Sequence, residues 1–160
     1  MRIVLQRVSH GSVDVLDEET GKRDLTFEPQ TIGQGYVLLV GVSDMDGDEQ
    51  IAWLVHKIAN LRVFEDENGK MNLSIGSVGG SILSISQFTL FADVRKGNRP
   101  SFVHAAPPAQ AEALYESCKA YCRERVPVVE SGIFGADMQV ELCNDGPFTV
   151  MLDSDEIIKR

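Results

Sequence analysis

The sequence has 160 residues, 43% hydrophobic and 24% charged, a balance typical of a globular protein whose core fits one domain. Its formal net charge of −9 at pH 7 argues against broad binding along a nucleic-acid backbone, because such binding needs a basic surface. This charge still permits a local pocket that receives the end of one strand.

The sequence contains neither a signal peptide nor an apolar stretch of the roughly 20 residues that a membrane helix needs, so we expect a cytoplasmic protein. Three cysteines, Cys118, Cys122 and Cys143, do not have the spacing of a zinc site. Cys118 and Cys122 lie four apart on an expected helix, where they could form half of a metal site. Two buried reduced thiols fit this spacing better, so we expect no disulfide and no metal.

The first part of the chain predicts strands followed by a helix. Residues 2–8 alternate into two faces, as a strand does, and the polar segment 17–24 is typical of a hairpin excursion. Residues 36–42 form a continuous apolar run that suits a buried strand. Residues 46–60 have helical spacing behind an acidic first turn, which predicts an amphipathic helix with an aspartate cap.

The rest of the chain predicts a second set of strands around a second helix. A strand is expected over 61–66 with a turn at 67–70, and a longer one over 82–91. Pro107 and Pro108 suit the first turn of a helix whose inner face carries Ala111, Leu114, Tyr115, Cys118 and Cys122. The closing strands are expected at 126–132, 137–145 and 148–153. This order predicts a single α+β domain over 1–160, with a curved, barrel-like sheet of mixed or antiparallel strands and two main helices packed on its outside.

The common catalytic motifs are absent from the sequence. His10, His56 and His104 lie outside any recognisable nucleophile–base motif and are interpreted as structural or surface residues. No GxGxxG or P-loop motif supports nucleotide-cofactor chemistry. The acidic cluster Asp44, Asp46, Asp48 and Glu49 lacks the full spacing of a calcium loop, and a helix cap explains it better.

Four local features are unusual for a plain core. SQFTL at 86–90 ends an apolar strand with hydroxyl and amide side chains, although an outward polar face would explain this too. GNRPSF at 97–102 carries a basic and an aromatic residue but could be only a turn. Arg7 shares a face with apolar neighbours, so it lies at a sheet edge or is buried and firmly hydrogen-bonded. In NDGPFT at 144–149, Asp-Gly signals a hairpin, but Pro147 removes a ladder donor and restricts Gly146.

Together these segments resemble the D-aminoacyl-tRNA deacylase (D-tyrosyl-tRNA deacylase) family. The likeness is carried by QRV at 6–8, SQFTL at 86–90, GNRPSF at 97–102 and FGADMQVELCNDGPFT at 134–149, and it extends from Met1 to about Leu152. The segment 17–29 departs from the family, because it is longer and more polar than the usual short hairpin.

The resemblance implies a homodimer with its active sites at the subunit interface. The enzyme would hydrolyse the ester that joins a D-amino acid, or glycine, to the terminal adenosine of tRNA, as chiral proofreading without metal or cofactor. It would insert a cis Gly146-Pro147 motif from one subunit into the pocket of the other, where main-chain carbonyls bind the substrate ammonium and exclude L side chains. Arg7 would brace this loop.

The resemblance also assigns Ser86, Gln87, Phe88 and Thr89 to the catalytic pocket. Thr89 could attack the ester as a nucleophile; alternatively, backbone amides around Gln87 and Phe88 stabilise the oxyanion while water attacks with help from the ribose 2′-hydroxyl, and we favour this second mechanism. Phe88 could stack on adenine or belong to the core.

Arg95, Lys96 and Arg99 could bind the terminal phosphates of the tRNA. Two rival hypotheses are a non-catalytic dimer that binds the end of a tRNA or another nucleic acid, and a general esterase with Thr89 as nucleophile.

Overall fold

The computed structural model describes residues 1–158, of which Ile157 is placed by its backbone only. In chain order the elements are β1 (Arg2–Leu16), β2 (Gln30–Ile32), β3 (Gly35–Gly41), α1 (Asp48–Asn60), β4 (Phe64–Glu65), β5 (Met71–Leu73), β6 (Ser81–Ser86), the 3₁₀-helix η1 (Phe88–Phe91), α2 (Pro108–Arg123), β7 (Val129–Ser131), β8 (Asp137–Asp153) and α3 (Ser154–Ile157). Within residues 1–158, no helix combines the length and the apolarity needed to cross a bilayer.

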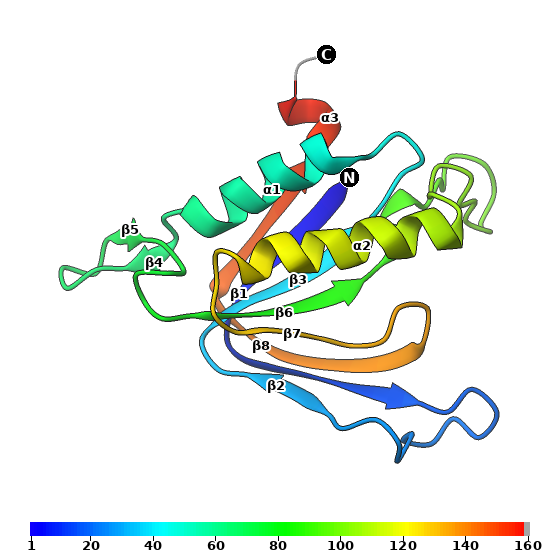
Figure 1. Ribbon diagram of the computed structural model, residues 1–160, viewed down its shortest axis with the longest axis horizontal. Helices are drawn as coiled ribbons and strands as arrows, with labels where there is room; N and C mark the ends of the chain where they lie inside the picture. Colours follow the sequence, from blue (N-terminus) through cyan, green and yellow to red (C-terminus); the bar gives the residue numbers. More distant parts are fainter. Residues whose placement is uncertain (159–160) are drawn as a thin grey trace.

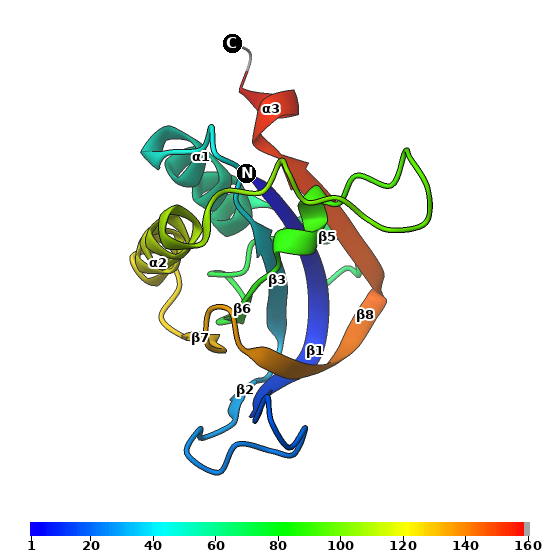
Figure 2. The ribbon, with the colours of Figure 1, turned by 90° about the vertical axis from the view of Figure 1, so that its right-hand side faces the viewer.

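Six strands form one strongly curved mixed sheet (Figure 2). Its order is β2-β1-β3-β6-β7, and β8 also pairs with β1. The contacts of β6 with β3 and β7 are parallel, and those of β1 with β2, β3 and β8 are antiparallel. The predicted α+β class and barrel-like sheet are therefore confirmed.

Two apolar clusters lie on opposite faces of this sheet. On one face, α1 and α2 pack side by side over β1, β3 and β6 (Figures 1 and 2), and every inward residue predicted for α2 except the half-buried Leu114 is buried there. On the other face, the first half of β8 lies over the sheet. Its residues Met138, Val140 and Leu142 pack against a smaller cluster, which consists of Val8, Val13, Ile32, Val37, Leu83 and Ile85. Cys118 and Cys122 are buried free thiols in α2, as expected.

The expected strand 82–91 is wrong beyond Ser86. The Gln87 amide donates the last bond to β3, at 2.7 Å from the Val40 carbonyl oxygen, and β3 ends at Gly41. With no further partner strand, the chain turns into η1, which packs directly on Gly41. A Cβ at Gly41 would lie 3.0 Å from the Gln87 carbonyl oxygen and 3.1 Å from the Leu90 Cβ.

The expected aspartate cap of α1 is also wrong. Gly47 is the N-cap, and its amide donates to Gln50 Oε1 at 2.9 Å. The carboxylate of Asp46 instead binds the Met1 ammonium and accepts bonds from the amide and hydroxyl of Ser43. The side chain of Asp46 is therefore committed to joining the start of β1 to the loop before α1.

The polar segment 17–29 connects β1 to β2 as the predicted hairpin excursion. Two aspartates order it: Asp17 accepts bonds from the amide and hydroxyl of Thr20, and Asp24 accepts the same pair from Thr26. These bonds favour the charged carboxylates and lower the pKa of both aspartates.

Candidate active site

A pocket of about 730 Å³ opens where the parallel strands β3 and β6 end. Its walls come from the ends of these strands, the start of η1, the segment 102–108 with the first turn of α2, and residues 134–140. The carboxyl ends of parallel strands meet at one edge of a sheet and often bind ligands there. The predicted residues Ser86, Gln87 and Phe88 all line this pocket.

Thr89 is placed differently from its three neighbours. It does not line the pocket, and its Oγ1 accepts a hydrogen bond from the Gln87 side-chain amide at 2.5 Å. Among the described residues that line the pocket, Asp137 carries the one ionisable side chain and no histidine is present. A hydroxyl bound to an amide, without a neighbouring base, is a weak nucleophile.

The main-chain amides at the start of η1 differ in their availability. The Gln87 amide is committed to the Val40 carbonyl. Phe88 is the first residue of η1, and the first amides of a helix have no partner within it. Within residues 1–158 no acceptor is bound to the Phe88 amide, so this amide can donate a hydrogen bond to an oxygen on which negative charge develops.

Phe88 lies at the surface, and its interpretation as a core residue is wrong. Its side chain is 56% exposed and forms an edge-on pair with Phe102, with 4.8 Å between ring centroids. Both rings line the pocket. An exposed aromatic pair beside a pocket can stack against a flat ligand such as a nucleobase.

The segment Asp145–Phe148 protrudes from the middle of β8. Thr149 pairs with Gln6 and Asn144 pairs with Val8, so these four residues lie opposite Arg7 alone in the β1–β8 ladder. The expected closing strands 137–145 and 148–153 are therefore one continuous strand, and NDGPFT does not close a hairpin. The Gly146-Pro147 bond is cis, and both residues are exposed.

Arg7 and Asn144 hold the base of this protrusion. The buried Arg7 donates from Nε to the Asp145 carbonyl at 2.9 Å and from Nη1 to the Val63 carbonyl, and its guanidinium lies 5.4 Å from the Phe148 ring centroid. The Asn144 Oδ1 accepts from the Phe148 amide at 2.6 Å, and its Nδ2 donates to the Phe148 carbonyl at 3.2 Å. Sequence reasoning missed Asn144, although an asparagine directly before an Asp-Gly turn signals such a side-chain clasp.

The protrusion and the pocket lie at different levels of the sheet. Ser86 pairs with Val40, which pairs with Ile3, whereas the protrusion lies beside Arg7. Four strand residues span about 13 Å. Neither Gly146 nor Pro147 lines the pocket of its own chain.

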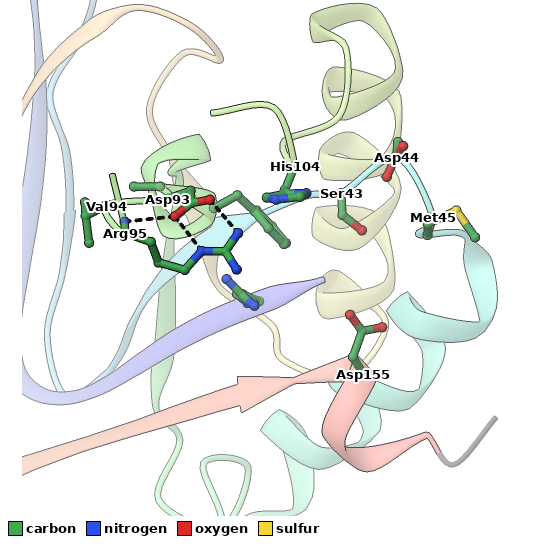
Figure 3. Close-up of a pocket in the computed structure, with 11 residues that line it drawn as sticks. Ser43, Asp44, Met45, Asp93, Val94, Arg95, His104 and Asp155 are labelled. Atoms are coloured by element: carbon green, nitrogen blue, oxygen red, sulfur yellow. Dashed lines mark hydrogen bonds and ion pairs between the residues drawn. The ribbon is translucent and has the colours of Figure 1, made fainter. Parts of the chain in front are cut away.

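The predicted RNA-binding cations are exposed on the loop between Asp93 and Ser101, outside this pocket. Arg95 forms a two-bond pair with Asp93, and it lines a second pocket of about 530 Å³ (Figure 3). Lys96 and Arg99 lie farther along the loop. For residues 1–158, no group of three or more His, Cys, Asp or Glu has a geometry that could hold a metal ion.

Comparison with known proteins decides the family. The family model described as D-Tyr-tRNA(Tyr) deacylase matches residues 4–153. The chain belongs to the D-Tyr-tRNA(Tyr) deacylase family. Two curated relatives carry the name D-aminoacyl-tRNA deacylase. The protein from Bifidobacterium adolescentis is 65% identical over 98% of this chain and 99% of its own, and that from Thermomicrobium roseum is 53% identical over 98% and 96%.

Solved structures support the fold of this deacylase family. The c-Myc DNA Unwinding Element Binding Protein is 42% identical and superposes with a TM-score of 0.83, over 96% of this chain and 98% of its own. A probable eukaryotic D-amino acid tRNA deacylase is 20% identical, with a TM-score of 0.76 over 94% of this chain and 97% of its own, and this likeness concerns the fold alone.

Proposed function

We propose that the protein hydrolyses the ester of D-aminoacyl-tRNA, and of glycyl-tRNA, to the free amino acid and tRNA. The supporting observation is the pocket at the ends of β3 and β6, where Ser86, Gln87 and Phe88 meet in a chain of the D-Tyr-tRNA(Tyr) deacylase family. Removing mischarged D-amino acids in this way is a proofreading activity.

The selection of handedness is assigned to the protrusion of a second subunit. The protrusion is exposed, is clasped at its base by Arg7 and Asn144, and lies about 13 Å along the sheet from the pocket of its own chain. In a homodimer it would enter the partner's pocket, where its carbonyls accept hydrogen bonds from the substrate ammonium. With ammonium and ester both fixed, an L side chain meets main chain, whereas a D side chain or a glycine hydrogen does not.

The proposed chemistry is attack of water on the ester carbonyl carbon. The carbonyl electrons move onto oxygen, and the Phe88 amide donates to this oxyanion; one such donor contributes about 3 to 4 kcal/mol. The intermediate collapses, the bond to the ribose oxygen breaks, and the proton from water passes to that oxygen with help from the neighbouring 2′-hydroxyl. Water is the nucleophile in this scheme, so Thr89 is not required as one; its Oγ1 accepts a hydrogen bond from the Gln87 side-chain amide.

Recognition of the tRNA would be confined to its acceptor end. The exposed ring of Phe88 offers a stacking surface for the terminal adenine, and Arg95, Lys96 and Arg99 offer cations to nearby phosphates. Such local contacts are compatible with a net charge of −9.

The activity is tested by incubating the protein with matched D- and L-aminoacyl-tRNA, each with and without a chelator. We expect rapid loss of the D ester, survival of the L ester and no effect of the chelator. Indifference to handedness would favour a general esterase, and the absence of turnover would favour a nucleic-acid binder, a second candidate raised by the DNA-binding name of the 42% identical neighbour.

The cross-subunit arrangement is tested by mixing two defective variants. One carries a lesion in the protrusion and the other a lesion in the pocket, and their mixed dimer contains one site built from two intact halves. We expect mixing to restore selective D-ester hydrolysis. A monomer in solution, or no restoration after subunit exchange, would contradict the arrangement.

A further inference from the structure

The second pocket lies beside the active-site pocket, because three segments line both. The segment that follows β3, the helix η1 and the loop before α2 contribute residues to both pockets. Val42, Phe88 and Phe102 line the first pocket, and Ser43, Phe91 and His104 line the second. Phe88 and Phe91 are three residues apart in a 3₁₀-helix, a rise of about 6 Å. The two pockets are therefore neighbours along η1, as two sites for consecutive nucleotides of one strand must be.

The second pocket combines apolar surface with polar edges. Met45 and Val94 are 65% and 67% exposed, so apolar atoms that could cover a base remain open to solvent. In the view of Figure 3, the pair of Asp93 and Arg95 lies on one side, Asp44 on the other, and His104 between them. Such a lining suits a flat heterocycle with donors and acceptors on its rim.

Two groups of this lining are open to a ligand. Within residues 1–158, the exposed carboxylate of Asp44 forms no hydrogen bond or ion pair. Arg95 uses Nε and Nη2 on Asp93, at 2.9 and 2.6 Å, and this contact holds the pKa of Asp93 well below its ordinary value. A guanidinium has five N–H donors, so Arg95 keeps others for a carbonyl or phosphate oxygen.

Resting on the function proposed above, we propose that this pocket binds the cytidine that precedes the terminal adenosine of tRNA. The terminal adenosine occupies the active-site pocket, and the next nucleotide of the common CCA end then reaches the adjoining one. Cytosine presents an exocyclic amine, which pairs with a carboxylate such as that of Asp44, whereas uracil presents a carbonyl at the same place. Asp44 would thus recognise the base, and Arg95 and His104 would donate hydrogen bonds to the carbonyl or phosphate oxygens of the same nucleotide.

The kinetic test compares two minimal substrates, D-tyrosyl esters of the dinucleotides CpA and UpA, which differ in this amine. We expect kcat/KM to favour the cytidine substrate about tenfold, the scale of one charge-assisted hydrogen bond. Asp44→Ala should bring this ratio close to one. Glu49→Ala removes an exposed carboxylate that does not line the pocket, and it should keep the ratio. Equal values for both substrates, or an unchanged ratio in Asp44→Ala, would overturn the proposal.

A binding test separates this proposal from the proposed function. The dissociation constants of the unacylated trinucleotides CCA and CUA do not depend on hydrolysis, and we expect CCA to bind about tenfold more tightly. A preference for CCA that Asp44→Ala abolishes, in a protein that hydrolyses neither ester, would support the cytidine site and reject the deacylase. Hydrolysis of D esters without any preference in either assay would reject the cytidine site alone. No hydrolysis of D esters, together with equal dissociation constants for CCA and CUA, would reject both the deacylase and the cytidine site.

Discussion

Arg7 donates a hydrogen bond to the carbonyl oxygen of Asp145, the residue directly before Gly146, at 2.9 Å. A second arm of the same guanidinium donates to the Val63 carbonyl, so one buried side chain ties the protrusion of β8 to the segment before β4. Arginine suits this task because its planar fork fixes two acceptors at once.

Arg7→Lys should therefore keep the positive charge but lose the paired hydrogen bonds to the Asp145 and Val63 carbonyls. We expect the D-to-L ratio of kcat/KM to fall about tenfold and the protein to lose about 1 to 3 kcal/mol of stability, because one buried carbonyl loses its donor. Kinetics on both esters and denaturant unfolding measure these effects. Arg62→Lys is the matched control, since the exposed Arg62 also donates from Nε to a carbonyl, that of Asn72. Unchanged selectivity in Arg7→Lys would show that the clasp is not needed.

Gly146→Ala should loosen the rejection of L esters. Gly146 has φ +140°, and an added Cβ would lie 3.0 Å from the Phe148 amide nitrogen and 3.2 Å from Arg7 Nη2. The main chain must shift to relieve these contacts, so we expect L-ester hydrolysis to become measurable. Gly69→Ala is a control with positive φ and open space around it. The same L-ester rate for both variants would contradict a role of the protrusion in selection.

Thr89→Ala should keep at least about one third of kcat. The Thr89 hydroxyl accepts from Gln87 and does not line the pocket, so its removal deletes no base and no oxyanion donor. Single-turnover hydrolysis of D-aminoacyl-tRNA measures the chemical step directly. A loss of several orders of magnitude, in a variant that keeps the fold and the oligomeric state of the unchanged protein, would revive the nucleophile mechanism.

Phe88→Ala should raise KM by about tenfold or more, because stacking on a base contributes about 1 to 3 kcal/mol. The ring is more than half exposed, so the fold should survive its removal. Phe88→Tyr keeps a stacking surface and should restore most of the affinity. Equal KM values for Phe88→Ala and the unchanged protein would place the adenine elsewhere.

The salt dependence of tRNA binding should be shallow. If Arg95, Lys96 and Arg99 are the phosphate contacts, the slope of log K against log salt is about −2, at about −0.7 per contact with a single strand. Replacing Lys96 by alanine should make the slope shallower by about 0.7. Lys22→Ala is the control, since Lys22 is exposed but lies away from this loop, and it should leave the slope unchanged. A slope steeper than about −5 would indicate a much broader interface.

The sequence predicted the elements whose periodicity is local and strong. The apolar spacing of Ile51, Leu54, Val55 and Ile58 and the Pro107-Pro108 start reproduced α1 and α2 closely. The prediction failed where pairing with a strand distant in the sequence decides where an element ends. Nothing within residues 87–91 reveals that β3 ends at Gly41, yet that ending stops β6 and starts η1.

The site was predictable to a similar extent. The family resemblance carried by SQFTL assigned these residues to a pocket, whereas their polarity alone left an outward strand face equally open. The hydrogen bond from the Gln87 amide to Val40 depends on the strand pairing and cannot be predicted from the sequence. Arg7 stood out because a cation on an apolar face requires a partner. Asn144 was missed although asparagine before Asp-Gly is a turn signal, because only the β1–β8 register shows that its side chain holds the base of a protrusion.

The register of β1 against β8 resumes at Gln6 and Thr149 after the four residues of the protrusion. β8 pairs with β1 on both sides of the protrusion, at Thr149 with Gln6 and at Asn144 with Val8. Insertions or deletions between Asp145 and Phe148 therefore change how far the protrusion extends without reversing which side chains of β8 face inward. The reach of this segment is therefore a separately adjustable length, and evolution can tune it while the sheet that carries it stays the same.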